Sequence, residues 1–277
     1  MSEFYVSSGA RLGFSDSGAG LPVVFLHPTP LDRDYWRPLV SLLAPMRTIV
    51  PDLRGHGVSE LGTGLPDGLF ARVPNAPALT MAQLGTDTVA LLDHLKLASA
   101  VFVGCSIGGY VMLELWRRAP ECMKGLAFVC SKPQPDAEAT LERRAATIAQ
   151  ARAGEAAKFF DGNARNIVGA TTRERRPEVV GEVRSRMTLT ADALIAVQAG
   201  LAERPDSTPT VATVTAPVLA IAGGEDPAVS IAEMEAFRAA PGGCDFHVVA
   251  DAGHFAAYEQ PERVAAILSG WLKRAEA

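Results

Sequence analysis

The chain has 277 residues, of which 48% are hydrophobic and 21% charged, and its formal net charge is −5. This length can bury a large core as one domain, or as one domain that carries an insertion. The negative charge provides no basic field for nucleic acid or an anionic membrane surface. Because residues 1–5 show no secretion signal and no uncharged apolar run reaches transmembrane length, we expect a cytoplasmic protein.

The order of apolar runs predicts strands that alternate with helices. Residues 3–6 and 11–16 are expected to form an antiparallel pair. Continuous apolar runs predict further strands at residues 23–27, 48–50, 100–103, 125–130, 218–222 and 246–249. Helices are predicted at about 35–43, 81–95, 107–119, 231–239 and from Pro261 onward. This alternation implies an α/β fold, with a mostly parallel sheet flanked by helices on both faces.

The composition changes after the strand at 125–130. Residues 133–208 contain almost no strand-like run and are rich in Ala, Glu and Arg. Their helical stretches fall at about 137–153, 154–161, 174–187 and 190–203. We therefore expect residues 133–208 to form a helical cap or lid, inserted into a core made of residues 1–132 and 209–277.

The four cysteines are Cys105, Cys122, Cys130 and Cys244, and none of them forms a C-x-x-C pair. In a chain of this length without a secretion signal, scattered cysteines indicate reduced thiols that are mostly in the core. We expect neither a disulfide framework nor a metal site.

A Gly-x-Ser-x-Gly pentapeptide lies at residues 104–108, between a predicted strand and a predicted helix. In this context the serine stands on a sharp turn, exposed at the carboxyl edge of a sheet. Gly104 and Gly108 remove the side chains that such a turn would bring into contact. We therefore predict that Ser106 is a nucleophile. The alternative is a serine that only caps the helix, while Cys105 is expected to point elsewhere on the turn.

A serine nucleophile needs a base, normally a histidine that a carboxylate orients. His254 follows the last predicted strand on a loop, where catalytic groups of such sheets collect. Asp226 follows the strand at 218–222 and is the predicted acid; Glu225 is its nearest competitor, and Asp251 lies too close to His254. The order Ser, Asp, His along the chain is that of α/β-hydrolases.

The oxyanion formed during acyl transfer needs two N–H donors aimed at one point. The first predicted donor is Ile107, the residue after the nucleophile. The second is Thr29, in the loop after the strand at 23–27. Pro28 and Pro30 flank Thr29 and have no N–H, so Thr29 is the donor available in the middle of this loop.

These residues resemble the α/β-hydrolase superfamily. The motifs that carry the resemblance are residues 26–30 (LHPTP), 51–59 (PDLRGHGVS), 104–109 (GCSIGG) and 252–254 (AGH). The resemblance implies a structural role for Arg54 and His56, and a cofactor-free enzyme similar to small esterases, enol-lactonases and haloperoxidase-like perhydrolases. Pro28 stands where the family usually has glycine. A serine at 106 argues against haloalkane dehalogenases and epoxide hydrolases, which use aspartate there.

We therefore expect a serine hydrolase that cleaves a small carboxylic ester or lactone through an acyl-enzyme. A carbon–carbon bond hydrolase or a perhydrolase could use the same triad. From another class of function, the chain could be a ligand-binding protein that kept the fold and lost turnover. The sequence does not indicate the acyl group, the alcohol or the oligomeric state.

The substrate pocket has the weakest signals. Trp36 and Phe255 flank predicted active-site loops, and Met187 is an apolar candidate in the insertion. Leu189, Leu194 and Val197 could also line an apolar pocket, although packing between lid helices explains all four insertion residues as well. The insertion and its flanks also carry arginines that could bind an anionic substrate, but most are expected on solvated helix faces: Arg143, Arg144, Arg152, Arg173, Arg175 and Arg176.

Overall fold

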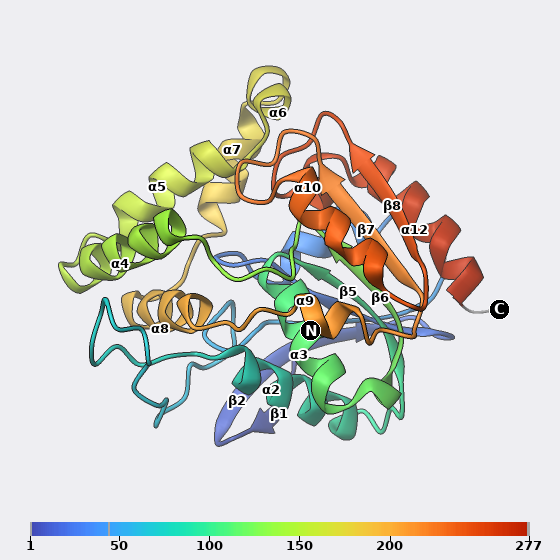
Figure 1. Cartoon of the computed structure of the whole chain (residues 1–277), viewed down its shortest axis with the longest axis horizontal. Coiled ribbons are helices and arrows are strands. Elements are labelled where there is room, and N and C mark those ends of the chain that lie inside the picture. Colours follow the sequence, from blue (N-terminus) through green and yellow to red (C-terminus); the bar gives the residue numbers. More distant parts are fainter. Residues whose placement is uncertain (1, 44, 276–277) are drawn as a thin grey trace.

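The computed structural model describes residues 2–43 and 45–275, which build an eight-stranded sheet flanked by helices (Figure 1). The strands lie in the order β1-β2-β4-β3-β5-β6-β7-β8. Their bounds are β1 (Glu3–Ser7), β2 (Ala10–Ser17), β3 (Pro22–Leu26), β4 (Arg47–Pro51), β5 (Ala100–Cys105), β6 (Met123–Val129), β7 (Val218–Gly223) and β8 (Cys244–Val249). Each strand that the apolar pattern predicts is present.

The sheet is parallel except at one edge. β1 pairs with β2, and β2 with β4, in antiparallel register. From β4 to β8 every neighbouring pair is parallel. The predicted mostly parallel sheet is therefore confirmed, and the carboxyl ends of its parallel strands share one edge, where loops bring functional side chains together.

Two layers of helices cover the sheet. The helices before β6 are α1 (Arg37–Val40), α2 (Met81–His94) and α3 (Ile107–Arg118), and those after β7 are α10 (Ile231–Met234), α11 (Ala256–Glu259) and α12 (Pro261–Ala275). Short 3-10 turns lie at Arg33–Trp36, Pro120–Cys122 and Glu235–Ala239. A helix was expected at 35–43. The structure instead has the 3-10 turn Arg33–Trp36 followed by the short α1, which ends at Val40. Asp32 caps the 3-10 turn by accepting from Asp34 N at 3.0 Å, and regular α-helix begins at Arg37.

Side-chain alternation along the central strands divides the core into two parts. On β3, Val23 and Phe25 belong to the cluster that packs against α12, and Val24 and Leu26 to the cluster that packs against α2 and α3. All four side chains are fully buried. Strands that are buried on both faces are continuously apolar, which explains why β3, β5 and β7 have no polar alternation.

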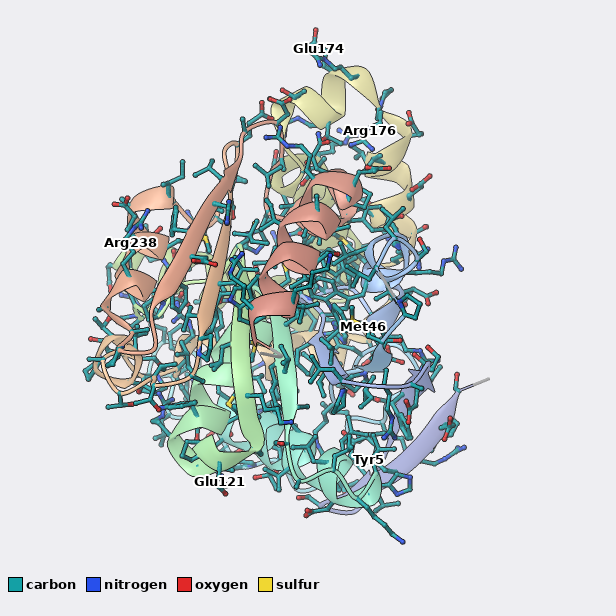
Figure 2. All side chains as sticks on the ribbon, turned by 90° about the vertical axis from the view of Figure 1, so that its right-hand side faces the viewer. Tyr5, Met46, Glu121, Glu174, Arg176 and Arg238 are labelled. Atoms are coloured by element: carbon teal, nitrogen blue, oxygen red, sulfur yellow. The ribbon has the colours of Figure 1, made fainter. Side chains whose placement is uncertain are left out.

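A helical insert leaves the sheet after β6 and returns at β7. It comprises α4 (Glu138–Arg152), α5 (Ala156–Ile167), α6 (Ala170–Arg175), α7 (Glu178–Ser185) and α8 (Ala191–Ala202), followed by the short α9 (Thr208–Val211). In Figure 1 the insert occupies the side of the molecule away from α12. In Figure 2, Glu174 and Arg176 mark its tip, at the opposite end of the molecule from Tyr5 and Glu121.

None of the helices in residues 2–43 and 45–275 combines the length and the apolarity needed to cross a membrane.

The junction of β5 and α3 depends on a close approach of the helix to the sheet. A Cβ atom on Gly108 would lie 2.3 Å from the carbonyl oxygen of Leu26 on β3. A Cβ atom on Gly104 would lie 2.6 Å from the carbonyl carbon of Gly108. The atoms that these Cβ atoms would meet belong to the backbone, which cannot shift without moving β3 or α3. Glycine at both positions therefore lets α3 begin directly above the sheet.

We expect Gly108→Ala to lower the free energy of unfolding by about 3 kcal/mol or more, because the added methyl overlaps the backbone of β3. The control is Gly270→Ala on α12, where an added Cβ meets no atom within 4 Å. That change should stabilise the protein by about 0.5–1 kcal/mol through helix propensity. Urea unfolding of both variants tests the difference, and equal stabilities would contradict the packing described here.

Candidate active site

Ser106 sits on a strained turn between β5 and α3. Its backbone has φ 52° and ψ −115°, a conformation that residues other than glycine rarely adopt. The backbone is held on both sides: Ser106 N donates to Val129 O at 3.1 Å, and Ser106 O accepts from Gly109 N and Ser131 Oγ, both at 2.9 Å. The side chain lines a cavity, as expected of a serine raised on this kind of turn.

His254 and Asp226 are paired beside this cavity. His254 Nδ1 lies 3.0 and 2.9 Å from the two carboxylate oxygens of Asp226. A carboxylate only accepts, so Nδ1 carries the proton and Nε2 is available as a base. Asp226 Oδ1 also accepts from the backbone N–H groups of Ala228 (2.7 Å) and Val229 (3.0 Å), which fixes the carboxylate. His254 lines the same cavity as Ser106.

The competing acid, Glu225, is turned away from the histidine. Its carboxylate accepts from the backbone N–H of Thr171 at 2.8 Å and from the hydroxyl of the same residue. The Thr171 hydroxyl bond holds the pKa of Glu225 below its usual range. Glu225 therefore ties the β7 loop to α6 of the insert, and the structure pairs Asp226, not Glu225, with His254.

Of the two expected oxyanion donors, Ile107 directly follows Ser106 in the chain, and Thr29 lines the same cavity as Ser106. Thr29 and Pro30 line the cavity, and the Ile107 N–H is the first of α3. Within the described chain neither the Thr29 nor the Ile107 N–H donates to a protein acceptor. Residues 28–31 close a turn, in which Leu31 N donates to Pro28 O at 3.1 Å and the Thr29–Pro30 peptide is cis. Pro28 thus contributes its carbonyl to the turn.

Two buried, neutral histidines form hydrogen bonds to the loop that carries Thr29. His27 Nδ1 donates to Pro28 O at 3.0 Å, and its Nε2 accepts from Leu53 N at 2.9 Å. His56 Nδ1 donates to Arg54 O at 2.9 Å, so its Nε2 accepts from the Thr29 hydroxyl at 3.0 Å. Burial lowers the pKa of His27 to about 4 and that of His56 to about 3. Both are therefore neutral structural groups at pH 7.

A buried carboxylate that the sequence analysis missed holds the His254 loop. The Glu259 carboxylate accepts from the backbone N–H of Gly253 (3.0 Å), of Phe255 (3.2 Å) and of Gly169 (2.9 Å). The first two donors flank His254, and the third belongs to the insert. His254 N in turn donates to Ile167 O at 3.1 Å. The available signal was a single acidic residue directly after the apolar stretch 255–258, where a charge is buried only if it is bonded.

Cys105 is not a rival nucleophile. It is fully buried, the Tyr35 hydroxyl donates to its sulfur at 3.2 Å, and burial raises the pKa of the thiol. Because the thiolate is the reactive form, this cysteine is inert at neutral pH. In the part of the chain that the structure describes, no three His, Cys, Asp or Glu side chains gather as metal ligands would.

The cavity that holds Ser106 and His254 has a volume of about 570 Å³ and is roofed by the insert. The expected pocket residues are not at its wall. Trp36 packs on Phe25 with ring centroids 5.4 Å apart, Phe255 packs on Tyr35 at 5.7 Å, and Met187 is buried in the core. Leu189, Leu194 and Val197 also pack in the core clusters. These apolar side chains fill the core, while α4 and α5 present mainly polar side chains to the cavity.

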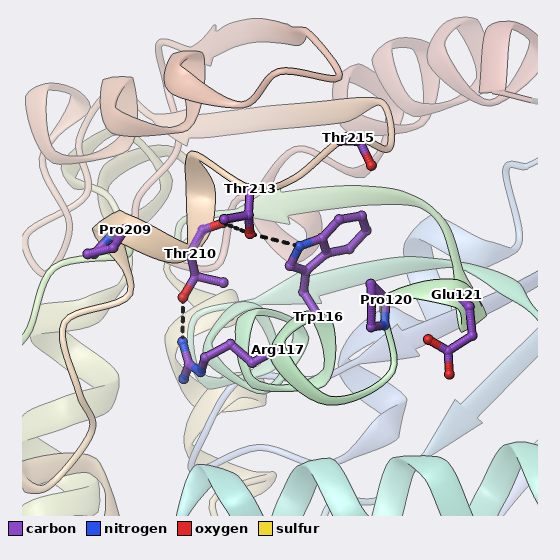
Figure 3. Close-up of a pocket in the computed structure, with 8 residues that line it drawn as sticks. All are labelled: Trp116, Arg117, Pro120, Glu121, Pro209, Thr210, Thr213 and Thr215. Atoms are coloured by element: carbon purple, nitrogen blue, oxygen red, sulfur yellow. Dashed lines mark hydrogen bonds between the residues drawn. The ribbon is translucent and has the colours of Figure 1, made fainter.

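A second hollow of about 720 Å³ lies at the end of α3 (Figure 3). Four of its polar side chains are bonded in pairs: Trp116 Nε1 donates to Thr213 Oγ1 at 3.1 Å, and Arg117 Nη1 donates to Thr210 Oγ1 at 2.9 Å. Its lining includes neither Ser106 nor His254. This hollow is therefore separate from the candidate active site.

The chain is similar in sequence and in structure to several known proteins. A sequence model of the alpha/beta hydrolase family matches residues 23–267. A putative non-heme bromoperoxidase, BpoC, of Mycobacterium tuberculosis is 26% identical over 262 residues, covering 92% of this chain and 94% of that protein. The 3-oxoadipate enol-lactonase 1 of Acinetobacter baylyi is 27% identical over 260 residues, covering 91% of this chain and 88% of that protein. The malate-bound structure of a thermophilic esterase from Thermogutta terrifontis is 30% identical, with a TM-score of 0.89 and full coverage of both chains.

We expect Glu259→Ala to lower the free energy of unfolding by about 2–4 kcal/mol, because it leaves three buried N–H groups without acceptors. The matched control is Glu262→Ala at an exposed position of α12, which should stay within about 0.5 kcal/mol of the parent. Urea unfolding measures both. Equal effects of the two substitutions would show that the Glu259 bonds do not hold the loop.

Acidification should destabilise the protein through His27 and His56. Between their folded pKa values and the ordinary value of about 6.5, the unfolded chain binds protons that the folded chain does not. The free energy of unfolding should therefore fall as pH drops from about 6.5 toward 4, by up to about 1.4 kcal/mol per pH unit for each histidine. Urea unfolding across this range should show a shallower slope for His56→Gln, and an unchanged slope would refute the assignment.

Proposed function

Because the chain belongs to the alpha/beta hydrolase family, we propose that it is a serine hydrolase that cleaves a carboxylic ester or a lactone. The observation that carries the proposal is that His254, paired with Asp226, lines the same cavity as the strained Ser106. A complete set of nucleophile, base and acid favours an enzyme over a ligand-binding protein, because binding alone does not need all three groups.

In the proposed reaction Ser106 Oγ attacks the carbonyl carbon, and His254 Nε2 takes the hydroxyl proton. Asp226 holds the imidazole in the tautomer with a protonated Nδ1 and stabilises its cation. The Thr29 and Ile107 N–H groups bind the oxyanion. His254 then gives the proton to the leaving alkoxide, which leaves Ser106 acylated. A water molecule, deprotonated by His254, hydrolyses the acyl-enzyme and regenerates the serine.

The insert is proposed to act as the cap of this site, over residues 133–208. Its α4 and α5 supply much of the cavity wall, and a volume of about 570 Å³ suits a small molecule. The relatives named as an esterase and as enol-lactonases support ester or lactone chemistry. The relatives named as bromoperoxidases and haloperoxidases favour perhydrolysis as a second candidate, in which hydrogen peroxide replaces water in deacylation.

The direct test is hydrolysis of p-nitrophenyl butyrate by the parent protein and by Ser106→Ala. We expect the substitution to lower kcat by about 10⁴-fold or more, because no other nucleophile is available. Cys105→Ser is the matched control on the same turn, and it should keep kcat within about tenfold. Activity retained in folded Ser106→Ala, or lost only in Cys105→Ser, would overturn the assignment.

A further inference from the structure

The wall of the active-site cavity is dominated by positive charge. Four basic side chains line it, and Asp136 is its one acidic residue among those described. The basic residues are Lys132, Arg143, Arg144 and Lys158. Two of the four are neutralised from outside the wall: Lys132 pairs with Glu233, and Lys158 pairs with Glu155 at 2.6 Å. The net charge of the wall therefore depends on Asp136 and on the two arginines of α4, Arg143 and Arg144.

Asp136 cannot neutralise Arg144, because it is shared with a second arginine. One carboxylate oxygen pairs with Arg144 Nε, and the other accepts from Arg204 Nη2 at 2.8 Å. Burial would raise the pKa of Asp136, but the two guanidinium groups outweigh burial and hold it below its usual range. The carboxylate is thus ionised, and the three side chains together carry one excess positive charge.

This excess charge is largely withdrawn from water. The side chains of Asp136 and Arg204 are both 3% exposed, and that of Arg144 is 14% exposed. Arg204 is further held over the Tyr110 ring, with its guanidinium carbon 4.1 Å from the ring centroid. A buried charge without a counter-ion is costly. The cluster therefore favours an anion that reaches it from the cavity.

Arg144 is the arginine of the cluster that lines the cavity, whereas Arg204 does not line it. Its Nε is taken by Asp136, and its Nη1 donates to Gln198 Oε1 at 2.9 Å. Its Nη2 donates to no acceptor in residues 2–43 and 45–275. Beside it on α4, Arg143 donates to Thr140 Oγ1 at 2.8 Å and forms no ion pair within the same residues. Guanidinium N–H groups are suited to planar oxyanions such as carboxylates.

We propose that the natural ester or lactone carries a second, free carboxylate, which binds Arg144 in the cap while Ser106 attacks the carbonyl group. Arg143 at the exposed part of the wall adds attraction for the same anion. This inference rests on the proposed function, since it assigns a substrate class to the same cavity. It makes Arg144 a specificity-determining residue that takes no part in proton transfer.

The test compares two series of methyl esters, with methanol release as the readout. The anionic series is the monomethyl esters of succinate, glutarate, adipate and suberate. The neutral series is the methyl alkanoates in which a methyl group replaces each free carboxylate. We expect the parent enzyme to prefer the anionic member of at least one pair by about tenfold or more in kcat/KM, because charged hydrogen bonds of this kind are worth that factor.

Arg144→Gln should remove this preference by raising KM for the anionic ester about 10- to 100-fold, while the matched neutral ester changes by less than about threefold. Arg144→Lys should restore part of it. Arg152→Gln is the control on the same helix, since Arg152 donates to the Asn75 carbonyl at 3.1 Å and does not line the cavity.

Hydrolysis of neutral esters with no anionic preference in any pair would overturn this inference and leave the proposed function intact. The same holds if folded Arg144→Gln keeps the preference. The parent comparison needs no variant, so it decides the question even if Arg144→Gln does not fold. Failure of the parent to hydrolyse any of these esters or p-nitrophenyl butyrate would instead count against the proposed function.

Discussion

The close approach of α3 to the sheet is the constraint on which the site depends. Gly108 lies against the Leu26 carbonyl, and Gly104 against Gly108, with no room for a Cβ atom at either position. This contact forces the chain to turn within one residue, and Ser106 takes the strained conformation. The strain persists because the backbone of Ser106 is bonded to β6, to α3 and to Ser131. The serine is therefore positioned by the packing of the core, before any substrate binds.

The other groups of the site reach the same edge from later strands, and buried carboxylates fix them there. Asp226 orients His254, while Glu259 holds the backbone on both sides of that histidine. Glu259 and Glu225 also accept from Gly169 and Thr171 of the insert. The insert is thus anchored directly on the loops that carry Asp226 and His254. Its helices α4 and α5 present charged and amide side chains to the cavity, so the same segment anchors the loops and shapes the cavity.

The sequence predicted the parts of this arrangement that local rules determine. Continuous apolar runs located the strands, and a Gly-x-Ser-x-Gly turn with a histidine and an aspartate after later strands indicated a site at one sheet edge. The cavity wall was not predictable in this way. Trp36 and Phe255 are apolar neighbours of site loops, but apolarity only says that a side chain is buried. The pairing of Asp136 with Arg204 joins residues 68 positions apart, and the bonds of Glu259 to Gly169 span 90 positions, so neither has a local pattern.

The central claim is that Ser106 is an activated nucleophile, and covalent labelling tests it most directly. The folded protein should react with a fluorophosphonate probe to give one adduct, which peptide mass spectrometry places on Ser106. The same probe should give no adduct on the heat-denatured chain, because activation depends on His254 and on the strained turn. A well-folded protein that remains unlabelled, or that is labelled at a residue other than Ser106, would contradict this account.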